Sequence, residues 1–399
     1  GPTSVINQSL VGVALEARKH GHIEKLFGAR HGVRGIINDD LIDLGAASTD
    51  LLERIAITPS SALGSTRDKP DAEYCEKILK AFAQNNVRTF FYIGGNDSAD
   101  AARIVSELAK RDGHDLTVYH IPKTIDNDLR VHDHTPGFGS AAKFVAAAIM
   151  GDNFDNRSLP GIKVDIVMGR HAGFLTAASV LARQHDEDGP HLIYVPESPV
   201  SEEKILGDID RVYSKQGRCL VAVSEGITFP DGKTWAQKLA EGMKEHIERD
   251  SHGNMQLSGT GALGDYLADL IKDKLSASGK KLRVRADTFG YLQRSFPGFV
   301  SDVDAREARM VGQLAVQFSA EGKGDGSVAM RRAGTDGYKI EYFLTPLQTV
   351  ARETKHMDPS YIDNGNNITD AFKKYAAPLV GELPRVGTFD EIALIAETK

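Results

Sequence analysis

The sequence is poor in cysteine, with only Cys75 and Cys219 among 399 residues. The two lie far apart and form no C-x-x-C pair, which excludes a zinc ribbon and a disulfide framework. No apolar run approaches the ~20 residues of a membrane-spanning helix. No signal-peptide pattern precedes the first motif. We therefore expect no membrane partner and a location in the reducing cytoplasm.

Positively charged residues are outnumbered, since the sequence has 48 lysines and arginines but 55 aspartates and glutamates. The formal net charge of −7 provides no general basic field, so we expect no nucleic-acid partner. An anionic substrate must then be held by local cations. The length allows two or three domains and a large core.

The stretch Ile121–Asp128, I-P-K-T-I-D-N-D, is the most informative part of the sequence. The apolar run Leu116–Ile121 predicts a buried strand, so Lys123, Asp126 and Asp128 follow a strand end, where open α/β sheets bind ligands. A lysine with paired aspartates can hold an anion, a metal ion and a proton-accepting base. Phosphoryl transfer needs this equipment, since its catalysis is mostly positioning and charge stabilisation. The alternative is a solvated turn.

A second polar cluster, Gly94–Ser98, follows the strand predicted over 87–93 and precedes a predicted helix. The two glycines are expected to permit positive φ and a close approach of backbone to phosphate. Parallel pairing of the two predicted strands would bring this cluster and Ile121–Asp128 to one sheet edge. The alternative is an ordinary structural Gly-Gly turn.

Strands alternate with helices through most of the chain, which predicts parallel, doubly wound sheets. Further strands are predicted over 164–168, 191–195, 219–224 and 283–291. Helices are predicted over 72–85, from Gly139 to about Met150, and to Arg183. Polar residues at strand ends of a second sheet are Arg170, Glu197 and Glu225.

The chain opens on a glycine turn at Gly1 that leads into a helix, and a helix N-terminus is a ready anion site. A strand normally precedes such a turn, so we expect several more residues upstream. Alternatively, Gly1-Pro2 is a cloning remnant.

Together these motifs resemble the phosphofructokinase A family. The matching motifs are the opening glycine turn, Gly64–Arg67, Gly94–Ser98, Pro122–Asp128, Met168–Arg170, Ser224–Gly226 and Gly290–Arg294. Each motif is weak alone, but their order and spacing from Gly1 to about Met330 are specific. The resemblance implies an α/β fold of two doubly wound, Rossmann-like lobes with the active site in the cleft between them.

The resemblance also implies a domain plan. We expect a phosphoryl-donor domain over 1–137 and a sugar-phosphate domain over 138–290. Residues 291–399 would cross back between the lobes and end in an extension. We further expect Mg²⁺ as cofactor and a homodimer or homotetramer.

The roles of individual residues follow from the same resemblance. Asp126 would accept the proton from the 1-hydroxyl of fructose 6-phosphate, and Arg170 would steady the transferring phosphoryl group. The catalytic residues are thus Asp126, Lys123 and Arg170. The donor-binding residues are Gly1, Asn96, Asp97 and Lys123. The substrate-binding residues are Thr124, Asp126, Met168, Gly169, Arg170, Glu225, Arg285, Tyr291 and Arg294. The metal-binding residues are Asn96, Asp97 and Asp128.

One of these assignments has an even alternative. Arg285 would reach the sugar-phosphate site of a neighbouring subunit. Alternatively, it belongs to a solvated basic face with Lys280, Lys281 and Arg283.

Two positions bear on the identity of the phosphoryl donor. ATP-using members have a small residue in place of Asp97 and glycine in place of Lys123. Asp97 adds bulk and negative charge on the path of a nucleotide α-phosphate, whereas Lys123 adds a cation beside the base. The tail Val350–Met357 also resembles the longer pyrophosphate-type members. We interpret the chain as a glycolytic enzyme that reversibly converts pyrophosphate and fructose 6-phosphate to fructose 1,6-bisphosphate and phosphate.

Two departures from the family pattern leave questions open. Asn96 stands where the family usually has an aspartate that binds magnesium, and an amide oxygen coordinates without charge. Asp97, Asp126 or Asp128 would then contribute more. Gly161 stands near the place of a sugar-phosphate arginine, for which Arg157 or Lys163 are alternatives.

Four other functions remain as alternatives to this interpretation. The first is an ATP-dependent phosphofructokinase, and the second is a catalytically silent regulatory paralogue. The third is a lipid or NAD kinase, and the fourth is an enzyme of the same type acting on sedoheptulose 7-phosphate.

Overall fold

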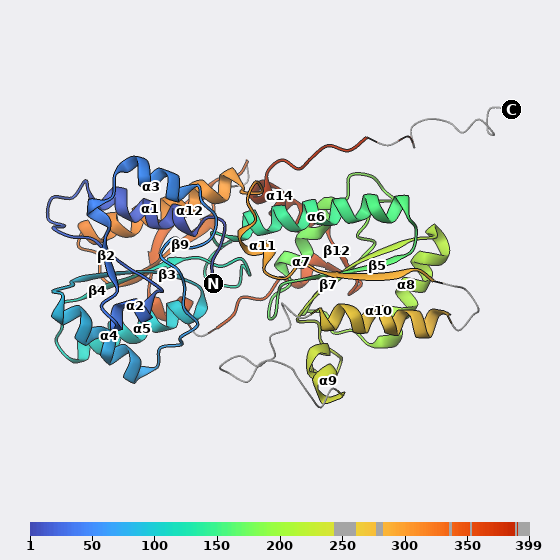
Figure 1. Cartoon of the computed structure of the whole chain (residues 1–399), viewed down its shortest axis with the longest axis horizontal. Helices are drawn as coiled ribbons and strands as arrows, with labels where there is room; N and C mark the ends of the chain where they lie inside the picture. The colour runs from blue at the N-terminus through green and yellow to red at the C-terminus, as the bar shows by residue number, and fades with distance from the viewer. Residues whose placement is uncertain (243–260, 277–281, 335–336, 352, 388, 390–399) are drawn as a thin grey trace.

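Two α/β lobes lie side by side in the computed structural model, which describes residues 1–242, 261–276, 282–334, 337–351, 353–387 and 389 (Figure 1). Each lobe has a four-stranded sheet with helices on both faces. The predicted class, α/β with two doubly wound lobes, is therefore confirmed.

The first lobe is built on a mixed sheet. Its strands in spatial order are β10 (Ile340–Thr345), β9 (Gly326–Arg332), β4 (Thr117–Pro122) and β3 (Thr89–Gly94). Its main helices are α1 (Ile6–Ala17), α4 (Ala72–Gln84), α5 (Asn96–Arg111) and α12 (Asp302–Ala320). Strands β3, β4 and β9 are parallel, and β10 is an antiparallel edge. On β4, Val118 packs with α4 and α5 while Tyr119 packs with α1 and α12, so the strand is buried on both faces.

The second lobe is built on an entirely parallel sheet. Its strands in spatial order are β6 (Leu192–Tyr194), β7 (Cys219–Ser224), β5 (Ile162–Val167) and β8 (Val284–Thr288). Its main helices are α6 (Phe138–Ser158), α8 (Glu202–Gln216), α10 (Ala262–Leu275) and α14 (Asp370–Val380). Helices α6 and α14 share one hydrophobic cluster, and α8 and α10 share the cluster on the other face.

Shorter elements complete the described chain. They are β1 (Phe27–Ala29), α2 (Val33–Ile37), β2 (Leu41–Asp43), η1 (Leu44–Ala46), α3 (Thr49–Ala56), α7 (Phe174–Ala178), η2 (Ser179–Ala182), α9 (Trp235–Gly242), α11 (Leu292–Ser295), α13 (Leu347–Val350), η4 (Pro359–Tyr361), β11 (Ile362–Asp363) and β12 (Asn367–Ile368). Across the described ranges, none of the helices has the length and apolar character needed to span a bilayer.

The predicted element boundaries differ most from the structure at three places. Helix α6 continues to Ser158 rather than ending near Met150, and in this extension Asn153 donates to Asp188 at 2.8 Å, a tertiary hydrogen bond that a sequence pattern does not reveal. The helix predicted to reach Arg183 is divided into α7 and η2. There the Ser179 hydroxyl bonds the Thr176 carbonyl and competes with regular helix bonding.

The third concerns β8, which ends at Thr288 rather than Tyr291. Gly290 follows with a φ of 54°, in the left-handed region that ends an extended strand.

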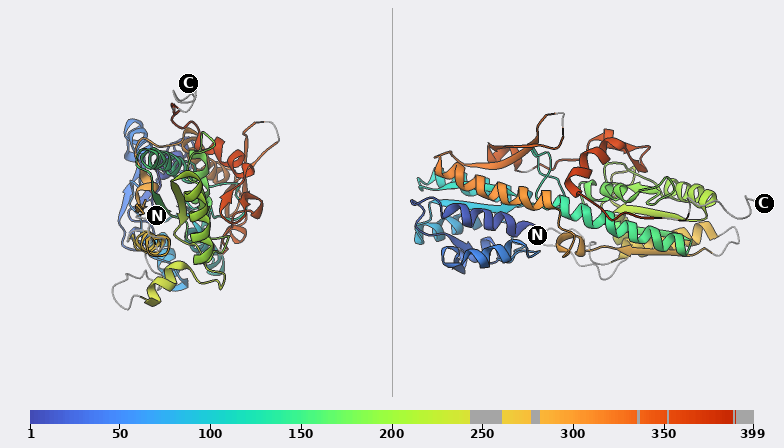
Figure 2. Two further views of the ribbon diagram at one scale, coloured as in Figure 1. Left: turned by 90° about the vertical axis from the view of Figure 1, so that its right-hand side faces the viewer. Right: turned by 90° about the horizontal axis from the view of Figure 1, so that it is seen from above.

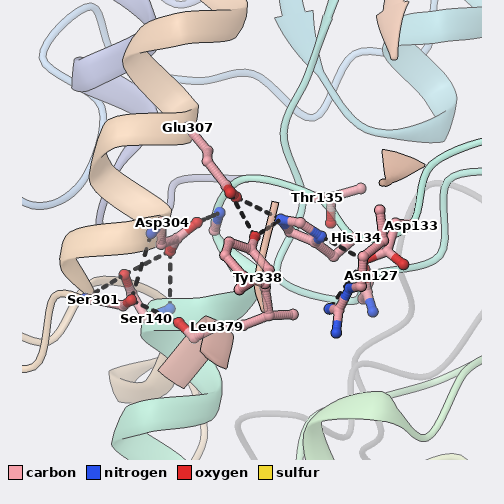
Figure 3. Close-up of polar contacts among 12 residues, drawn as sticks. Asn127, Asp133, His134, Thr135, Ser140, Ser301, Asp304, Glu307, Tyr338 and Leu379 are labelled. Atoms are coloured by element: carbon pink, nitrogen blue, oxygen red, sulfur yellow. Dashed lines mark hydrogen bonds and ion pairs between the residues drawn. The ribbon is translucent and has the colours of Figure 1, made fainter. Parts of the chain in front are cut away.

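The two lobes meet where α6 and α12 begin, and the two helices run in opposite directions from this junction (Figure 2). Two helix N-termini bring two positive dipole ends together. The Asp304 carboxylate in the first turn of α12 lies between them. It accepts hydrogen bonds from Gly137 N at 2.8 Å, Ser140 N at 2.9 Å and the Ser140 hydroxyl at 2.6 Å (Figure 3). One buried carboxylate therefore caps α6 and joins it to α12.

A second polar group crosses the same junction. The buried His134 ring donates to the Asp133 carboxylate at 2.8 Å and to that of Glu307, which also accepts from the Tyr338 hydroxyl (Figure 3). Burial opposes the imidazolium charge, but the two carboxylates raise the pKa of His134 above its usual value. The loop before α6 is thereby fastened to α12.

Helices α1 and α12 pack closely at a pair of glycines. A Cβ on Gly12 would lie 2.4 Å from the Arg309 carbonyl oxygen, and a Cβ on Gly312 would lie 2.2 Å from the Ser9 carbonyl oxygen. Both neighbours are backbone atoms within helices, so neither can move away without shifting a helix. The glycines therefore set the distance between α1 and α12.

We predict that Gly12→Ala and Gly312→Ala each lower the free energy of unfolding by ~1–3 kcal/mol, the usual cost of overpacking. Gly151→Ala is the matched control, because Gly151 lies in α6 and a Cβ added there would meet no atom within 4 Å among the described residues. It should stabilise by ~0.5–1 kcal/mol through helix propensity. Urea unfolding followed by circular dichroism measures all three. Equal effects at the three positions would contradict the close packing.

Candidate active site

The two polar clusters singled out from the sequence lie at one sheet edge. Strands β3 and β4 are parallel with Gly94 opposite Pro122, as expected. A cavity of about 1830 Å³ opens at this edge and is lined from both lobes. The predicted site residues in its wall are Gly1, Asn96, Asp97, Lys123, Thr124, Asp126, Asp128, Met168, Arg170, Glu225, Tyr291 and Arg294. Gly169 and Arg285 are predicted site residues outside the wall.

Lys123 is buried at the end of β4, beside the opening glycine turn. Its ammonium donates to the Gly1 carbonyl at 2.6 Å, and its backbone N–H donates to the Gly94 carbonyl at 3.0 Å. Burial lowers the pKa of Lys123, whereas the carboxylates of Asp126 and Asp128 favour its charged form. The lysine thus joins the first turn, the end of β3 and the aspartate pair.

The aspartate pair is presented by a left-handed residue. Asn127 has a φ of 58°, is buried, and donates through Nδ2 to the Tyr375 hydroxyl at 2.8 Å. Asp126 and Asp128, on either side of it, line the cavity. The backbone N–H of Asp126 donates to the Thr124 hydroxyl at 3.1 Å, which fixes the turn before the carboxylate. Both carboxylates are therefore held toward the cavity by contacts that their neighbours make.

Asn96 and Asp128 form a pair of oxygen ligands. Asn96 Nδ2 donates to Asp128 Oδ2 at 2.8 Å, and Asn96 Oδ1 is buried without a hydrogen-bond partner among the described residues. Burial raises the pKa of Asp128 to about 7, and the nearby Asp126 carboxylate adds to the effect. An amide oxygen with no hydrogen-bond partner among the described residues, beside a carboxylate, suits a hard, oxygen-coordinated ion.

The glycines of the second cluster act differently from the prediction. Gly95 has a φ of −91° and Gly94 is not in the positive-φ region, so the expected positive φ was wrong. A Cβ on Gly94 would lie 2.0 Å from the Ser98 hydroxyl, so this glycine makes room for the Ser98 side chain, and the close approach of a phosphate stays a prediction. The Asp97 carboxylate forms a separate, exposed ion pair with the Lys69 ammonium at 3.6 Å.

Arg294 lies in α11 and lines the cavity. Its guanidinium carbon lies 4.1 Å from the centre of the Tyr291 ring, and its Nε is buried without a hydrogen-bond partner in the described ranges. Burial lowers the pKa of Arg294 and Arg67 adds to this, while the Asp126 and Glu225 carboxylates oppose it. Cations and carboxylates of both lobes thus act on one another across the cavity.

The turn that follows β5 carries Met168, Gly169 and Arg170. Gly169 has a φ of 144°, and its carbonyl accepts from the Ser224 hydroxyl at 2.6 Å. The Met168 N–H donates to Gln293 Oε1 at 3.3 Å. Gly169 therefore shapes the turn, and Met168 and Arg170 line the cavity.

The remaining cations of the second lobe lie elsewhere. Arg285 is exposed on β8 and its guanidinium donates to the Val284 carbonyl at 2.9 Å. The Arg283 guanidinium donates to the Leu159 carbonyl at 2.6 Å on the surface, while Lys280 and Lys281 lie outside the described residues. Arg157 pairs with Asp188 at 3.2 Å, and Lys163 with Asp152 at 2.6 Å and Asp287 at 2.9 Å. These two belong to ion pairs outside the cavity wall.

The cavity wall also contains residues to which the sequence pattern assigned no role: Arg67, Lys69, His171 and Thr354. Arg67 belongs to the motif Gly64–Arg67, which was a signal for it. Thr354 lies in the tail Val350–Met357, whose resemblance to pyrophosphate-type members was noted without a role for any single residue.

Comparison with known proteins places this geometry in a family. Residues 1–319 match the family model described as Phosphofructokinase. The pyrophosphate–fructose 6-phosphate 1-phosphotransferase of Rhodospirillum rubrum is 55% identical over 382 residues, 96% of this chain and 92% of that protein. The protein of the same name from Halomonas elongata is 34% identical over 391 residues, 95% of this chain and 90% of that protein. The crystal structure of the pyrophosphate-dependent phosphofructokinase from Marinobacter aquaeolei superposes with a TM-score of 0.83 at 32% identity, covering 99% of this chain and 93% of that one.

We predict that inorganic phosphate raises the melting temperature of the protein and that Arg294→Met weakens this effect. A hydrogen bond to a charged group contributes ~1.5–3 kcal/mol, so phosphate affinity should fall about 10- to 100-fold. Lys373→Met is the matched control, since Lys373 pairs with Asp370 on the surface of α14. Thermal shift against phosphate concentration gives the affinities. An unchanged phosphate response in Arg294→Met would mean that Arg294 does not bind the anion.

Proposed function

The chain belongs to the phosphofructokinase family, and from this premise we propose that it transfers a phosphoryl group from inorganic pyrophosphate to the 1-hydroxyl of fructose 6-phosphate. The products are fructose 1,6-bisphosphate and phosphate, and the reaction is reversible. The relatives named above support this function by their names. We place the reaction in glycolysis.

One observation carries the proposal: a buried lysine and two carboxylates of one lobe share a cavity with the arginines of the other lobe. Lys123, Asp126 and Asp128 line it from the end of β4, and Arg170 and Arg294 line it from the second lobe. A site of this kind can hold two phosphorylated molecules against one base. Positioning and charge stabilisation are what phosphoryl transfer requires.

In the proposed mechanism, Asp126 accepts the proton of the sugar 1-hydroxyl as that oxygen attacks phosphorus. The turn bonds at Thr124 and Asn127 hold its carboxylate toward the cavity. Arg294 and Tyr291 bind the 6-phosphate, because a guanidinium binds a phosphate dianion in two places. Met168, Gly169 and Glu225 form the sugar pocket, with Thr124 beside the base.

Arg170 steadies the phosphoryl group as it moves between the lobes. Lys123 offsets the charge that develops on that group, since it lies buried beside Asp126. Gly1, Asn96 and Asp97 surround the donor on the first lobe. Asp97 disfavours a nucleotide, because its carboxylate stands where an α-phosphate would pass.

The residues present fit a magnesium ion. Asn96 Oδ1 has no hydrogen-bond partner among the described residues, and Asp128 beside it has a pKa raised to about 7 by burial. We propose that Asn96 and Asp128 hold Mg²⁺, with Asp97 as a further ligand. When bound, the ion would neutralise charge on the phosphoryl oxygens. A cation would be held by the ionised form of the Asp128 carboxylate, whose pKa burial raises to about 7, so affinity for Mg²⁺ would rise with pH toward 7.

Two further parts of the proposal concern assembly and location. We propose a homodimer or homotetramer in which Arg285 reaches the sugar-phosphate site of the next subunit, and its exposure on β8 supports this. We also propose that the enzyme works in the cytoplasm. Cys75 and Cys219 are buried free thiols, as a reducing compartment would keep them.

We predict that Asp126→Asn lowers kcat by ~10²–10⁴-fold, the usual contribution of a positioned base. The KM for fructose 6-phosphate should change little, because the amide keeps the size of the side chain. Asp50→Asn is the control, since Asp50 is an exposed aspartate paired with Arg54 on α3. Steady-state kinetics with pyrophosphate give kcat for both variants. If Asp126→Asn kept a kcat near that of the unmodified enzyme, Asp126 would not be the catalytic base.

For the donor, we predict that Asp97→Gly opens a measurable activity with ATP and weakens the use of pyrophosphate. Lys123→Gly should reduce pyrophosphate turnover by ~10²–10³-fold, because it removes a charge aimed at the transferring group. Rates of both single variants and the double variant with each donor test this. An unmodified enzyme that uses ATP efficiently and pyrophosphate not at all would reverse the donor assignment.

A further inference from the structure

A segment of the C-terminal tail, Glu353–Met357, passes beside the cavity and contacts both lobes; we call it the strap. Its first half pairs with the chain that follows the catalytic turn. Thr354 forms an antiparallel bridge with Leu129, and the Lys355 N–H donates to the Asp128 carbonyl at 2.7 Å. The strap is thus bonded directly to the backbone of a proposed active-site residue.

The Lys355 side chain continues this attachment. Its ammonium donates to the His132 carbonyl at 3.0 Å and to the Asp133 carbonyl at 2.9 Å. It also lies 5.0 Å from the centre of the Phe174 ring, on α7 of the second lobe. One lysine therefore supplies donors to two carbonyls of the loop after Asp128 and packs against the other lobe.

The second half of the strap is bonded to the second lobe. The His356 ring donates to the His171 carbonyl at 3.0 Å, next to Arg170. The Met357 N–H donates to the Glu197 carboxylate at 3.0 Å, which also accepts from the Gly173 N–H at 3.0 Å. The turn that carries Arg170 is thereby held by the same short segment that holds the aspartate turn.

We propose that the strap is a positioning element for catalysis and that Lys355 is its positioning residue. The inference rests on the proposed function and adds to it. Asp126 and Arg170 come from different lobes, and their separation decides whether base, hydroxyl and phosphorus are aligned. Because a misplacement of ~1 Å can cost ~10²-fold in rate, a direct link between the two turns matters more to kcat than to substrate affinity.

The strap has a separate apolar anchor, which allows Lys355 to be changed without losing the fold. Val350 and Ala351 pack with Leu129 and Ala99 in a small buried cluster. The side chain of Lys355 is not part of that cluster. Methionine keeps the length and the contact with Phe174 but removes both donors.

The experiment compares Lys355→Met, Lys355→Arg and Lys373→Met in the full-length chain. With pyrophosphate and fructose 6-phosphate at saturating Mg²⁺, Lys355→Met should lower kcat about 10- to 100-fold, with each KM within about 3-fold. Lys355→Arg should recover part of the loss, because arginine can donate to both carbonyls. Lys373→Met, a surface lysine of α14 paired with Asp370, should behave as the unmodified enzyme.

Hydrogen exchange of the same variants gives a readout that does not depend on turnover. Amides over 128–133 should exchange faster in Lys355→Met, while those of β7 stay protected. An unchanged kcat, or a kcat loss matched by equal rises in both KM values and a lower melting temperature, would overturn the positioning role. If the unmodified enzyme shows no activity with pyrophosphate, the proposed function is wrong, and this result alone does not test the strap. Unchanged exchange over 128–133 would then overturn the attachment independently.

Discussion

The parallel pairing of β3 and β4 is the constraint on which the site depends. In its register Gly94 lies opposite Pro122, so the residues after each strand emerge together. Lys123 is the first charged residue at that edge, and it is buried. A buried ammonium needs acceptors and nearby negative charge. The Gly1 carbonyl and the carboxylates of Asp126 and Asp128 supply them.

The cavity belongs to both lobes, so its geometry depends on how rigidly they are joined. Three sets of contacts cross the junction. Asp304 caps α6 from α12, His134 joins the preceding loop to Glu307, and the strap connects the two turns that line the cavity. All three meet the loop between β4 and α6. The chain that carries the proposed base is therefore also the chain that joins the lobes.

Much of this arrangement could be predicted from sequence, because its signals are local. Apolar runs predicted the positions of β3, β4 and β7, and the charged residues that follow them, Lys123, Asp126, Asp128 and Glu225 among them, do line the cavity. What escaped prediction depends on contacts between residues distant in sequence. The part of α6 beyond the predicted end contains Asn153, which donates to Asp188 35 residues later, and Lys355 reaches carbonyls more than 200 residues earlier in the chain. The missing hydrogen-bond partner of Asn96 Oδ1, within the described part of the chain, becomes evident only once the fold is formed.

The most direct test asks whether the phosphoryl group transferred to fructose 6-phosphate comes from pyrophosphate rather than from a nucleotide. Phosphorus NMR tests it on the unmodified protein, with fructose 6-phosphate and Mg²⁺ in two samples that differ only in the donor. With pyrophosphate, the pyrophosphate signal should decline as a 1-phosphate signal of the sugar and an orthophosphate signal grow in equal amounts. With ATP, the sugar should remain unchanged. Growth of the 1-phosphate and ADP signals in the ATP sample, with pyrophosphate unconsumed in the other, would contradict the account.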